Sequence, residues 1–400
     1  MPFRCSVRVG LWRACGAGAL AALWRLASPT FPGVARALVV RRSSCKSYAA
    51  LGPGGPLVPH QLQRRPVGER DVAIRIKYAG ICHSDIHQVR QEWAEAMFPM
   101  VPGHEVGGVV QAVGAAVTKF RVGDRVGVGN LLDSCRQCRQ CLAGQENYCR
   151  TGPVYAYNDR FKYPHCAEFG DEAGGGRTYG GYSQAVVVDE AFVCRVPEAL
   201  DLAGATPLLC AGITVYSPLK FYGLRKKQRL GVAGLGGLGA MAVLIGKAMG
   251  ADVTVLSRSE AKRHEALQEL KADSFAIFPE AKEAGPVGVG DFDMIVDTIA
   301  GDHELQPYIR ALAPDGKLVV LGIPPKLLSF HAFELIAGRK SLAGSISGGI
   351  KETQEMLEFC AQHRITCPHE LIGASQINEA FDRVVRSDVK YRFVIDTGTM

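Results

Sequence analysis

The stretch GVAGLGGLGAMAV, residues 231–243, decides the fold of one half of the chain. Within it Gly234, Gly236 and Gly239 follow the spacing G-x-G-x-x-G, and Gly237 stands among them. An apolar strand candidate precedes the glycines and an apolar helix candidate follows. Such glycines permit a tight turn and let the amino end of the helix approach a pyrophosphate. In this context the motif predicts a dinucleotide-binding turn rather than only a flexible loop.

Strand candidates recur after this turn, with helical stretches such as 260–270 between them. The candidates lie at 230–233, 252–256, 274–278, 292–297 and 317–321. Strands that alternate with helices are typical of a doubly wound parallel sheet. We therefore predict an α/β protein in which residues 211–346 form a Rossmann domain.

The end of the second of these strands bears on the choice of nicotinamide cofactor. An acidic residue there would bind the ribose 2′-hydroxyl of NAD, whereas a hydroxyl and a cation accommodate the 2′-phosphate of NADP. The sequence places Ser257 and Arg258 at this point and Lys262 one turn further on. Ser259 also fits an ordinary helix N-cap, which is compatible with that role. The segment predicts NADP.

The half of the chain before this domain has the pattern of short strands. Val72, Ile74, Ile76 and Tyr78 alternate with polar residues, and 103–129 is rich in Val with Gly turns. Alternation with frequent turns predicts a bent β-rich domain, assigned to 46–210. Two amphipathic helices are predicted in a return segment, 347–400, that completes this first domain.

Four cysteines follow the spacing C-x2-C-x2-C-x7-C, at Cys135, Cys138, Cys141 and Cys149. Thiols this close together indicate a metal site rather than a disulfide framework. The spacing alone leaves open whether the metal reacts or only holds a loop.

A second candidate metal site needs residues that are far apart in the sequence. Cys82, His104 and Cys210 stand in GICHSDIH, PGHEVGG and PLLCAGIT. Each alone is a weak signal, because a cysteine in an apolar run is usually part of the core. Together, two Cys and one His form a ligand set that catalytic zinc uses.

The excess of basic residues is confined to the start of the chain. Of 46 Lys and Arg, seven arginines lie in 1–45, which holds no acidic residue, so the rest has 39 basic and 39 acidic residues. This balance argues against a nucleic-acid partner and against a nucleic-acid zinc ribbon. No apolar run is long enough to cross a bilayer, so no membrane partner is expected.

The first 45 residues are typical of an organelle transit peptide, with arginines around the apolar stretch at 14–24. A secretory signal and an unused upstream start are the competing interpretations. The arginines favour a mitochondrial or plastid address, with processing near 43–48; without use of the leader the protein would be cytoplasmic. Thirteen cysteines without paired, spread-out spacing favour a reducing compartment.

With these motifs in place, residues 47–396 resemble the zinc-dependent medium-chain alcohol dehydrogenases, in particular the cinnamyl alcohol dehydrogenase branch. The resemblance is carried by the following segments: GICHSDIHQ, PGHEVGGVV, the four-cysteine spacing, TYGGYS, PLLCAGITVYSPLK, GLGGLG, GGIKETQEML and YRFVID. It implies that the domain at 46–210 has the GroES-like fold.

The resemblance also implies roles for individual residues. Cys82, His104 and Cys210 would bind catalytic zinc, with Glu105 as an auxiliary acid near the metal, and the four clustered cysteines would bind structural zinc. The other implied roles are these: Ser84 and His87 in proton transfer through the cofactor ribose, Asp85 in orienting His104, and His83 near the pyrophosphate.

The implied activity is hydride transfer between NADP(H) and a primary alcohol or aldehyde, aromatic or of medium chain length, by a homodimer that binds two zinc ions per chain. Trp93, Leu131 and Tyr155 would line the pocket, and core packing is the competing interpretation. The stretch 158–177 is longer than usual for the family. Three alternatives are weighed. They are an NAD-dependent polyol dehydrogenase, which Ser257 and Arg258 disfavour, a quinone or enoyl reductase, which would lack the zinc ligands, and a zinc-stabilised binding protein without catalysis.

Overall fold

The computed structural model of the chain describes most of the sequence. The described residues are 43–163, 165, 176–278 and 290–400. The predicted leader lies outside them except for its last three residues, and so does most of the stretch 158–177.

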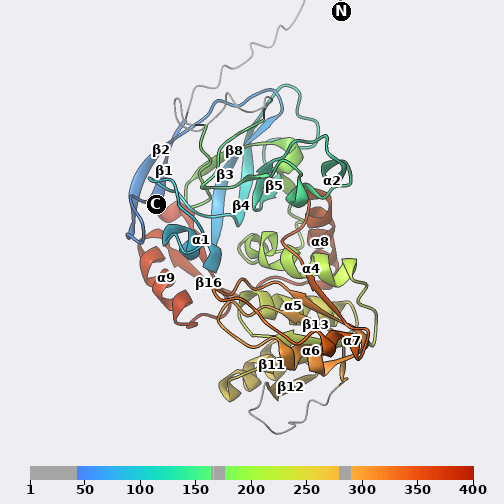
Figure 1. Cartoon of the computed structure of the whole chain (residues 1–400). Helices are drawn as coiled ribbons and strands as arrows, with labels where there is room; N and C mark the ends of the chain where they lie inside the picture. The colour runs from blue at the N-terminus through green and yellow to red at the C-terminus, as the bar shows by residue number, and fades with distance from the viewer. Residues whose placement is uncertain (1–42, 164, 166–175, 279–289) are drawn as a thin grey trace, which may run out of the picture. The chain divides into compact units, whose positions relative to one another are not determined.

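A seven-stranded sheet forms the core of the first domain (Figure 1). Its order is β16-β17-β3-β4-β5-β9, with β8 beside β3. The strands are β3 (Asp71–Ile81), β4 (Val106–Val113), β5 (Arg125–Val128), β8 (Ala185–Asp189), β9 (Cys194–Arg195), β16 (His369–Gly373) and β17 (Arg392–Asp396). On β3, Val72, Ile74 and Ile76 are buried and Arg75 is exposed. The predicted alternation therefore places one face of this strand in the core.

Short elements complete the first domain. They are the antiparallel pairs β1 (Ser43–Ala50) with β2 (Leu57–Arg64) and β6 (Leu131–Asp133) with β7 (Val154–Tyr155), and the helices α1 (His83–Val89), α2 (Arg139–Leu142) and α3 (Leu202–Ala205).

The hairpin β1–β2 changes the expected start of the folded domain. Ser43 already pairs with Arg64 across the hairpin, and Cys45 is 8% exposed within the apolar core. Cleavage between 43 and 48 would remove part of this strand and expose its apolar face to water. The predicted boundary at residue 45 therefore falls inside β1, and a cut that preserves the hairpin falls before Ser43.

Six parallel strands form the sheet of the second domain, in the order β12-β11-β10-β13-β14-β15. The strands are β10 (Arg229–Ala233), β11 (Asp252–Ser257), β12 (Ser274–Ile277), β13 (Phe292–Asp297), β14 (Leu312–Val320) and β15 (Ser341–Gly344). The five predicted strands overlap β10 to β14. The edge strand β15 is missing from the prediction because it is short and lacks an apolar run. The strand order reverses at β10, where doubly wound sheets bind their ligands.

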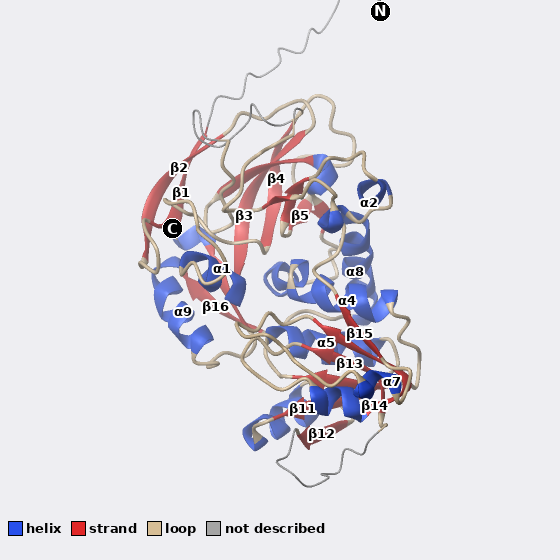
Figure 2. Ribbon diagram, viewed as in Figure 1, coloured by secondary structure: helices blue, strands red, loops and turns tan. Residues whose placement is uncertain are grey.

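Helices cover both faces of this sheet (Figure 2). On one face α4 (Ala211–Phe221) and α5 (Gly237–Ala248) share an apolar cluster with Val296. On the other face α6 (Gln306–Ala311) packs with Ile295. Because these two residues are neighbours on β13, both sides of one strand are buried. Burial on both sides explains why these strands read as continuous apolar runs.

The stretch 260–270 is helical, as predicted, but it does not form one regular α-helix. It consists of a 3₁₀ turn at Glu260–Lys262 and a π-helical turn at Glu265–Glu269. Glu269 forms an ion pair of 2.9 Å with Lys390, which lies far away in the sequence. Tertiary contacts of this kind can override local helix propensity.

The segment after the second domain returns to the first, as predicted. Of its two helices, α8 (Ile350–His363) packs on α4, and α9 (Ile377–Val385) buries Ile377, Ala380 and Phe381 at the predicted spacing. The strands β16 and β17 then complete the sheet of the first domain.

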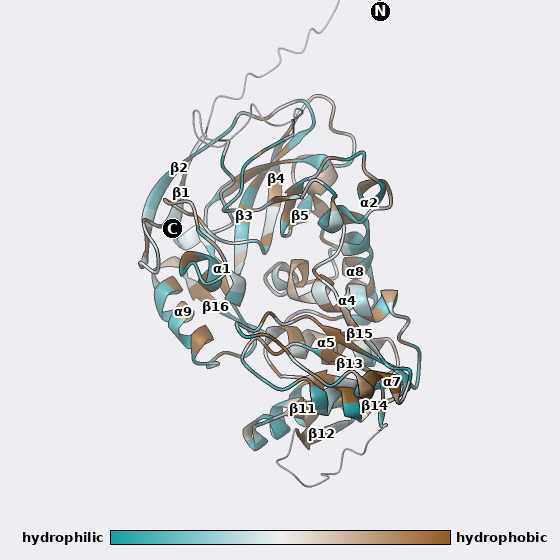
Figure 3. Ribbon diagram, in the orientation of Figure 1, coloured by the Kyte–Doolittle hydropathy of each residue, from teal (hydrophilic) through white to brown (hydrophobic). Residues whose placement is uncertain are grey.

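Helix α5 of the second domain is apolar, as its hydropathy colouring shows (Figure 3), and most of its residues are buried. Across the described residues, no single helix has the length and apolar character to cross a membrane. One bent pair, Leu202–Leu209 with Ala211–Phe221, meets that test only when its two parts are counted together.

Candidate active site

Four side chains from distant parts of the sequence converge in the first domain. The ligand atoms of Cys82, His104, Glu105 and Cys210 all lie within 4.8 Å of one another. The Nε2 atom of His104 is 3.2 Å from the Cys210 sulfur, and the sulfurs of Cys82 and Cys210 are 3.9 Å apart. Two thiols and one imidazole are donors that zinc takes where it keeps a fourth position open for substrate. The donor set therefore fits zinc.

Local structure explains why these residues meet. Cys82 follows the last residue of β3 and is the N-cap of α1. His104 and Glu105 directly precede β4, the neighbour of β3 in the sheet. Cys210 lies between a 3₁₀ turn and α4, where the chain enters the second domain. Sheet pairing thus brings two ligands together, and the junction of the domains supplies the third.

Asp85 contacts two members of this cluster, His104 and Cys82. Its carboxylate is fully buried, and Oδ1 lies 3.1 Å from Nδ1 of His104. Its other oxygen accepts a hydrogen bond of 3.0 Å from the backbone N–H of Cys82. A hydrogen held on Nδ1 leaves Nε2 free to bind a metal. Asp85 thus contacts the imidazole of His104, and its role toward a bound metal stays a prediction.

Arg392, on β17, is a residue of this site that sequence analysis does not identify. Its guanidinium is 3.0 Å from the Glu105 carboxylate and 3.4 Å from the Cys82 sulfur. Arg392 is only 7% exposed. Burial raises the pKa of Glu105 to about 7, although Arg392 opposes this increase. One signal in the sequence could have identified Arg392: it is the only charged residue between apolar neighbours in the segment YRFVI. An arginine in a buried strand needs an acidic partner, which would have pointed to an ion pair.

The residues expected to handle protons and cofactor lie together on α1. The Ser84 hydroxyl oxygen is 3.5 Å from the Cys82 sulfur. The rings of His83 and His87 stack with 4.6 Å between their centroids, and Trp93 stacks on His87 at 4.7 Å. Burial lowers the pKa of His83. These contacts order the helix face beside the metal ligands.

Glu92 is a second residue that sequence analysis missed. Its carboxylate contacts Nδ1 of His87. Glu92 lies beyond the end of α1, so helical spacing gives no signal for the pair. The contact places the imidazole hydrogen on Nδ1 and leaves Nε2 as the proton-accepting nitrogen.

The four clustered cysteines also come together as predicted from their spacing. Their sulfurs all lie within 4.8 Å of one another, and the described cysteines of the chain are free thiols. The sulfur of Cys141 is 3.5 Å from that of Cys138 and 3.8 Å from that of Cys135. Hydrogen bonds from Thr151 and Tyr163 outweigh burial and lower the pKa of Cys149 to about 5. Four thiolates fill a tetrahedral sphere, so the cluster fits structural zinc.

The glycine-rich turn has the geometry that the motif predicts. Gly234 has a φ of +86°, which favours glycine, and Gly236 is the N-cap of α5. A Cβ on Gly239 would lie 2.1 Å from the carbonyl oxygen of Gly234, and one on Gly237 would lie 2.9 Å from Arg392. A side chain would therefore clash with backbone at Gly239 and crowd Arg392 at Gly237, whereas the space beside Gly236 is open. The amino end of α5 remains available to an anion such as a pyrophosphate.

The residues predicted to select NADP lie at the carboxyl end of β11. Ser257 is the last residue of that strand and is buried, and Arg258 is exposed beyond it. The ammonium group of Lys262 is 2.8 Å from the carboxylate of Glu265. The segment thus presents a hydroxyl and a cation at the strand end, while Lys262 is already paired.

The predicted pocket-lining residues differ in exposure. Leu131 and Tyr155 are partners across β6 and β7, but Leu131 is buried in the core, whereas Tyr155 and Trp93 are exposed. A contact of these three side chains with substrate stays a prediction.

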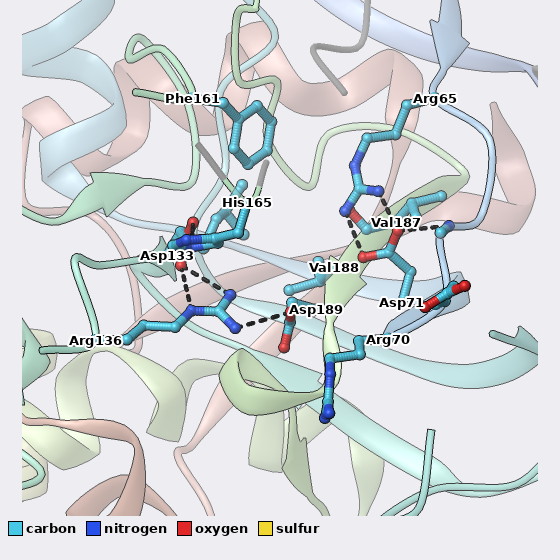
Figure 4. Close-up of a pocket in the computed structure, with 13 residues that line it drawn as sticks. Arg65, Arg70, Asp71, Asp133, Arg136, Phe161, His165, Val187, Val188 and Asp189 are labelled. Carbon is cyan, nitrogen blue, oxygen red and sulfur yellow. Dashed lines mark hydrogen bonds and ion pairs between the residues drawn. The ribbon is translucent and has the colours of Figure 1, made fainter. Parts of the chain in front are cut away.

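A separate polar cavity of about 520 Å³ lies in the first domain, and no predicted site residue lines it (Figure 4). Two of its three arginines are held by acids: Arg65 by Asp71, and Arg136 by Asp133 and Asp189. Such pairs tie the surrounding strands together and neutralise the charges. The cavity is therefore not the candidate active site.

Two family models match this chain. Residues 68–198 match the family model described as "Alcohol dehydrogenase GroES-like domain", and residues 237–362 match "Zinc-binding dehydrogenase". The chain is 47% identical to cinnamyl alcohol dehydrogenase 2 of Arabidopsis thaliana, over 90% of this chain and 93% of that protein. It is 49% identical to NADP-dependent alcohol dehydrogenase C of Mycobacterium bovis, over 90% and 100% respectively.

A solved structure shares the fold. It is described as CAD from Helicobacter pylori complexed with NADP(H), with a TM-score of 0.81 and 40% identity over 89% of this chain and 99% of that one. Fold, ligand clusters and glycine-rich turn define a two-domain, zinc-dependent dehydrogenase. The chain belongs to the zinc-binding alcohol dehydrogenase family, in which a GroES-like domain is joined to a Rossmann domain.

Proposed function

We propose that this protein is an NADP(H)-dependent alcohol dehydrogenase that reduces aldehydes and oxidises primary alcohols, with aromatic or medium-chain substrates. The observation that carries the proposal is the buried cluster of Cys82, His104 and Cys210 with Ser84 beside it. The names of the similar proteins, cinnamyl alcohol dehydrogenase and NADP-dependent alcohol dehydrogenase, support both the substrate class and the cofactor.

Cofactor and metal supply the chemistry that amino acids lack. When bound, zinc polarises the oxygen of an alcohol or aldehyde as a Lewis acid, and NADP(H) exchanges the hydride. Cys82, His104 and Cys210 would hold the zinc, and the turn at Gly234–Gly239 would hold the cofactor pyrophosphate. The role of the protein itself is to hold the zinc and the cofactor in place and to exclude water from the site.

Ser84 and His87 provide a path for the proton of the substrate hydroxyl. Ser84 lies next to Cys82, so its hydroxyl oxygen can accept a hydrogen bond at the reacting end of the site. His87 stacks between His83 and Trp93, and Glu92 holds its Nδ1. Its Nε2 is therefore the ring nitrogen that can accept this proton and pass it toward solvent.

The strand end at Ser257 and Arg258 is proposed to select NADP. We expect Ser257→Asp combined with Arg258→Gln to lower the ratio of kcat/KM for NADPH over NADH about 100-fold, because hydrogen bonds to a charged group contribute about 1.5–3 kcal/mol each. Initial rates with both cofactors measure this ratio. The matched control is Arg229→Gln, at the opposite end of the sheet, where Arg229 pairs with Asp291. An unchanged ratio in the double variant would refute the assignment.

The polyol dehydrogenase and the binding protein without catalysis predict different results. A polyol dehydrogenase would oxidise polyols with NAD, and a binding protein without catalysis would show no hydride transfer. The deciding assay compares cinnamaldehyde reduction with NADPH and with NADH, using protein that begins before Ser43, together with zinc content. Fast reduction with NADPH and two zinc ions per chain supports the proposal. Oxidation of polyols with NAD alone, or one zinc ion without activity, contradicts it.

The homodimer is proposed from the edge of the second sheet. β15 is the last strand of that sheet, and only β14 pairs with it among the described residues. Large apolar side chains in the segment that precedes it in the chain are exposed, including Leu327 at 98% and, on α7 (Phe333–Ile336), Phe333 and Ile336 at 71% each. An open edge strand beside an apolar patch fits a second copy of the chain. A sedimentation mass of one chain would contradict the pairing.

The organelle address is proposed from the leader alone. Seven arginines without acidic residues in 1–45 support a mitochondrial or plastid transit peptide. The hairpin β1–β2 adds that the cut should fall before Ser43. Amino-terminal sequencing of the protein from its own cells tests this, and an intact Met1 would contradict it.

A further inference from the structure

The carboxylate of Asp85 accepts hydrogen bonds from several groups besides His104. Its Oδ1 accepts from the backbone N–H of Gly103 at 3.1 Å and faces Nδ1 of His104 at 3.1 Å. Its Oδ2 accepts from the backbone N–H of Cys82 and from the hydroxyl of Tyr182, both at 3.0 Å. The last of these donors, the Tyr182 hydroxyl, belongs to a side chain 97 residues further along the chain than Asp85, and Tyr182 is 0% exposed.

Backbone pairing fixes the place of Tyr182. The backbone N–H of Tyr182 donates to the carbonyl of Pro102 at 3.0 Å, and that of Gly181 donates to the carbonyl of Gly103 at 2.8 Å. Gly103 has a φ of +106°, and a Cβ there would lie 2.6 Å from the Tyr182 ring. The ring is thus packed against the residue that directly precedes His104.

A buried arginine holds the same segment from the other side. Arg64, at the end of β2, is 0% exposed. Its guanidinium donates to the carbonyl oxygens of Tyr179 and Gly180 at 2.9 and 3.0 Å, and to the hydroxyl of Ser183 at 2.8 Å. Tyr182 therefore sits on a rigid support, so its hydroxyl has a defined direction.

We propose that Tyr182 is a positioning residue of the catalytic zinc site, which acts through Asp85. The hydroxyl fixes Oδ2, and a carboxylate fixed at Oδ2 can turn little about its Cβ–Cγ bond. Oδ1 then stays in line with Nδ1 of His104, and Nε2 stays aimed at the thiols. Outer hydrogen-bond partners of metal ligands commonly set metal affinity in this way. The inference rests on the proposed function, because it takes zinc as the occupant of the cluster.

The test is Tyr182→Phe, which removes the hydroxyl and keeps the ring against Gly103. We expect the zinc affinity of the catalytic site, measured by competition with a chelator, to fall about tenfold. The affinity of the four-cysteine site and the KM for NADPH should not change, while kcat falls with the occupancy of the catalytic site. The matched control is Tyr216→Phe, since that buried hydroxyl also donates to a carboxylate, Glu355, at 3.1 Å.

A double variant separates a positioning role from a packing role. If Tyr182 acts through Asp85, Tyr182→Phe should cause no further loss of zinc affinity in an Asp85→Asn background. If Tyr182→Phe lowers zinc affinity equally in the wild-type and the Asp85→Asn backgrounds, the proposal is overturned. The same holds if Tyr182→Phe and Tyr216→Phe have the same zinc affinity at the catalytic site. A wild-type protein that binds only one zinc ion would instead refute the proposed function itself.

Discussion

Replacing Cys82 with alanine is expected to lower kcat by roughly 10³-fold or more and to leave NADPH binding nearly unchanged. The substitution removes one of three zinc ligands at the centre of the site. Zinc contributes several kcal/mol of charge stabilisation to reactions of this type, and 1.4 kcal/mol corresponds to a tenfold change in rate. The cofactor turn at Gly234–Gly239 belongs to the other domain, so it is unaffected. Steady-state rates, cofactor fluorescence titration and zinc content measure the three effects.

A matched control for this variant is Cys360→Ala. Cys360 is also a fully buried thiol, but it lies on α8 and contacts Met356. The control should keep two zinc ions per chain and nearly full activity. Substantial turnover by Cys82→Ala, or an equal loss of activity in both variants, would contradict the assignment of Cys82 as a zinc ligand.

Replacing Arg392 with methionine is expected to lower the free energy of unfolding by about 3–5 kcal/mol, because it leaves the buried carboxylate of Glu105 without its counter-charge. Glu105 is 0% exposed and its carboxylate is 3.0 Å from the guanidinium. Methionine keeps most of the length and the apolar contacts of the side chain. Urea unfolding of the zinc-loaded protein measures the change.

Two further variants test the cause of this loss. Arg339→Met breaks an ion pair with Asp315 that is mostly exposed, and exposed pairs contribute about 0–1 kcal/mol. The double variant Arg392→Met with Glu105→Gln removes both buried charges and should recover most of the lost stability. A double variant as unstable as Arg392→Met would show that packing, not charge, is responsible.

The loss caused by Arg392→Met should also depend on pH. Burial already raises the pKa of Glu105 to about 7, and Arg392 opposes this increase, so the variant has a still higher pKa. A carboxyl group whose pKa is raised on folding gives its full stability below its unfolded pKa, 4.5, and loses it as pH rises through the folded value. The difference from wild type should therefore be larger at pH 8 than at pH 6. A difference that shrinks at pH 8 would contradict the charge argument.

Local patterns in the sequence were sufficient for much of the molecule. The glycine spacing at 234–239, the recurring apolar runs and the alternation on β3 predicted a doubly wound sheet beside a β-rich domain. The spacing of the four cysteines predicted a metal cluster whose sulfurs do lie close together. These features depend on residues near one another in the chain, so the local sequence is sufficient to predict them.

Residue type and family resemblance, and not spacing, grouped Cys82, His104 and Cys210 as one candidate site. Only tertiary structure brings those residues within reach of one another, and only it places Arg392 and Tyr182 beside them. The same is true of β1, whose hairpin moved the domain start, and of 260–270, where the pair Glu269–Lys390 accompanies a broken helix. Such contacts join residues tens to hundreds of positions apart, and no local pattern encodes them. The sequence by itself therefore determined the fold class and the ligand types, whereas the tertiary structure decided which buried charges and hydroxyls hold the site in place.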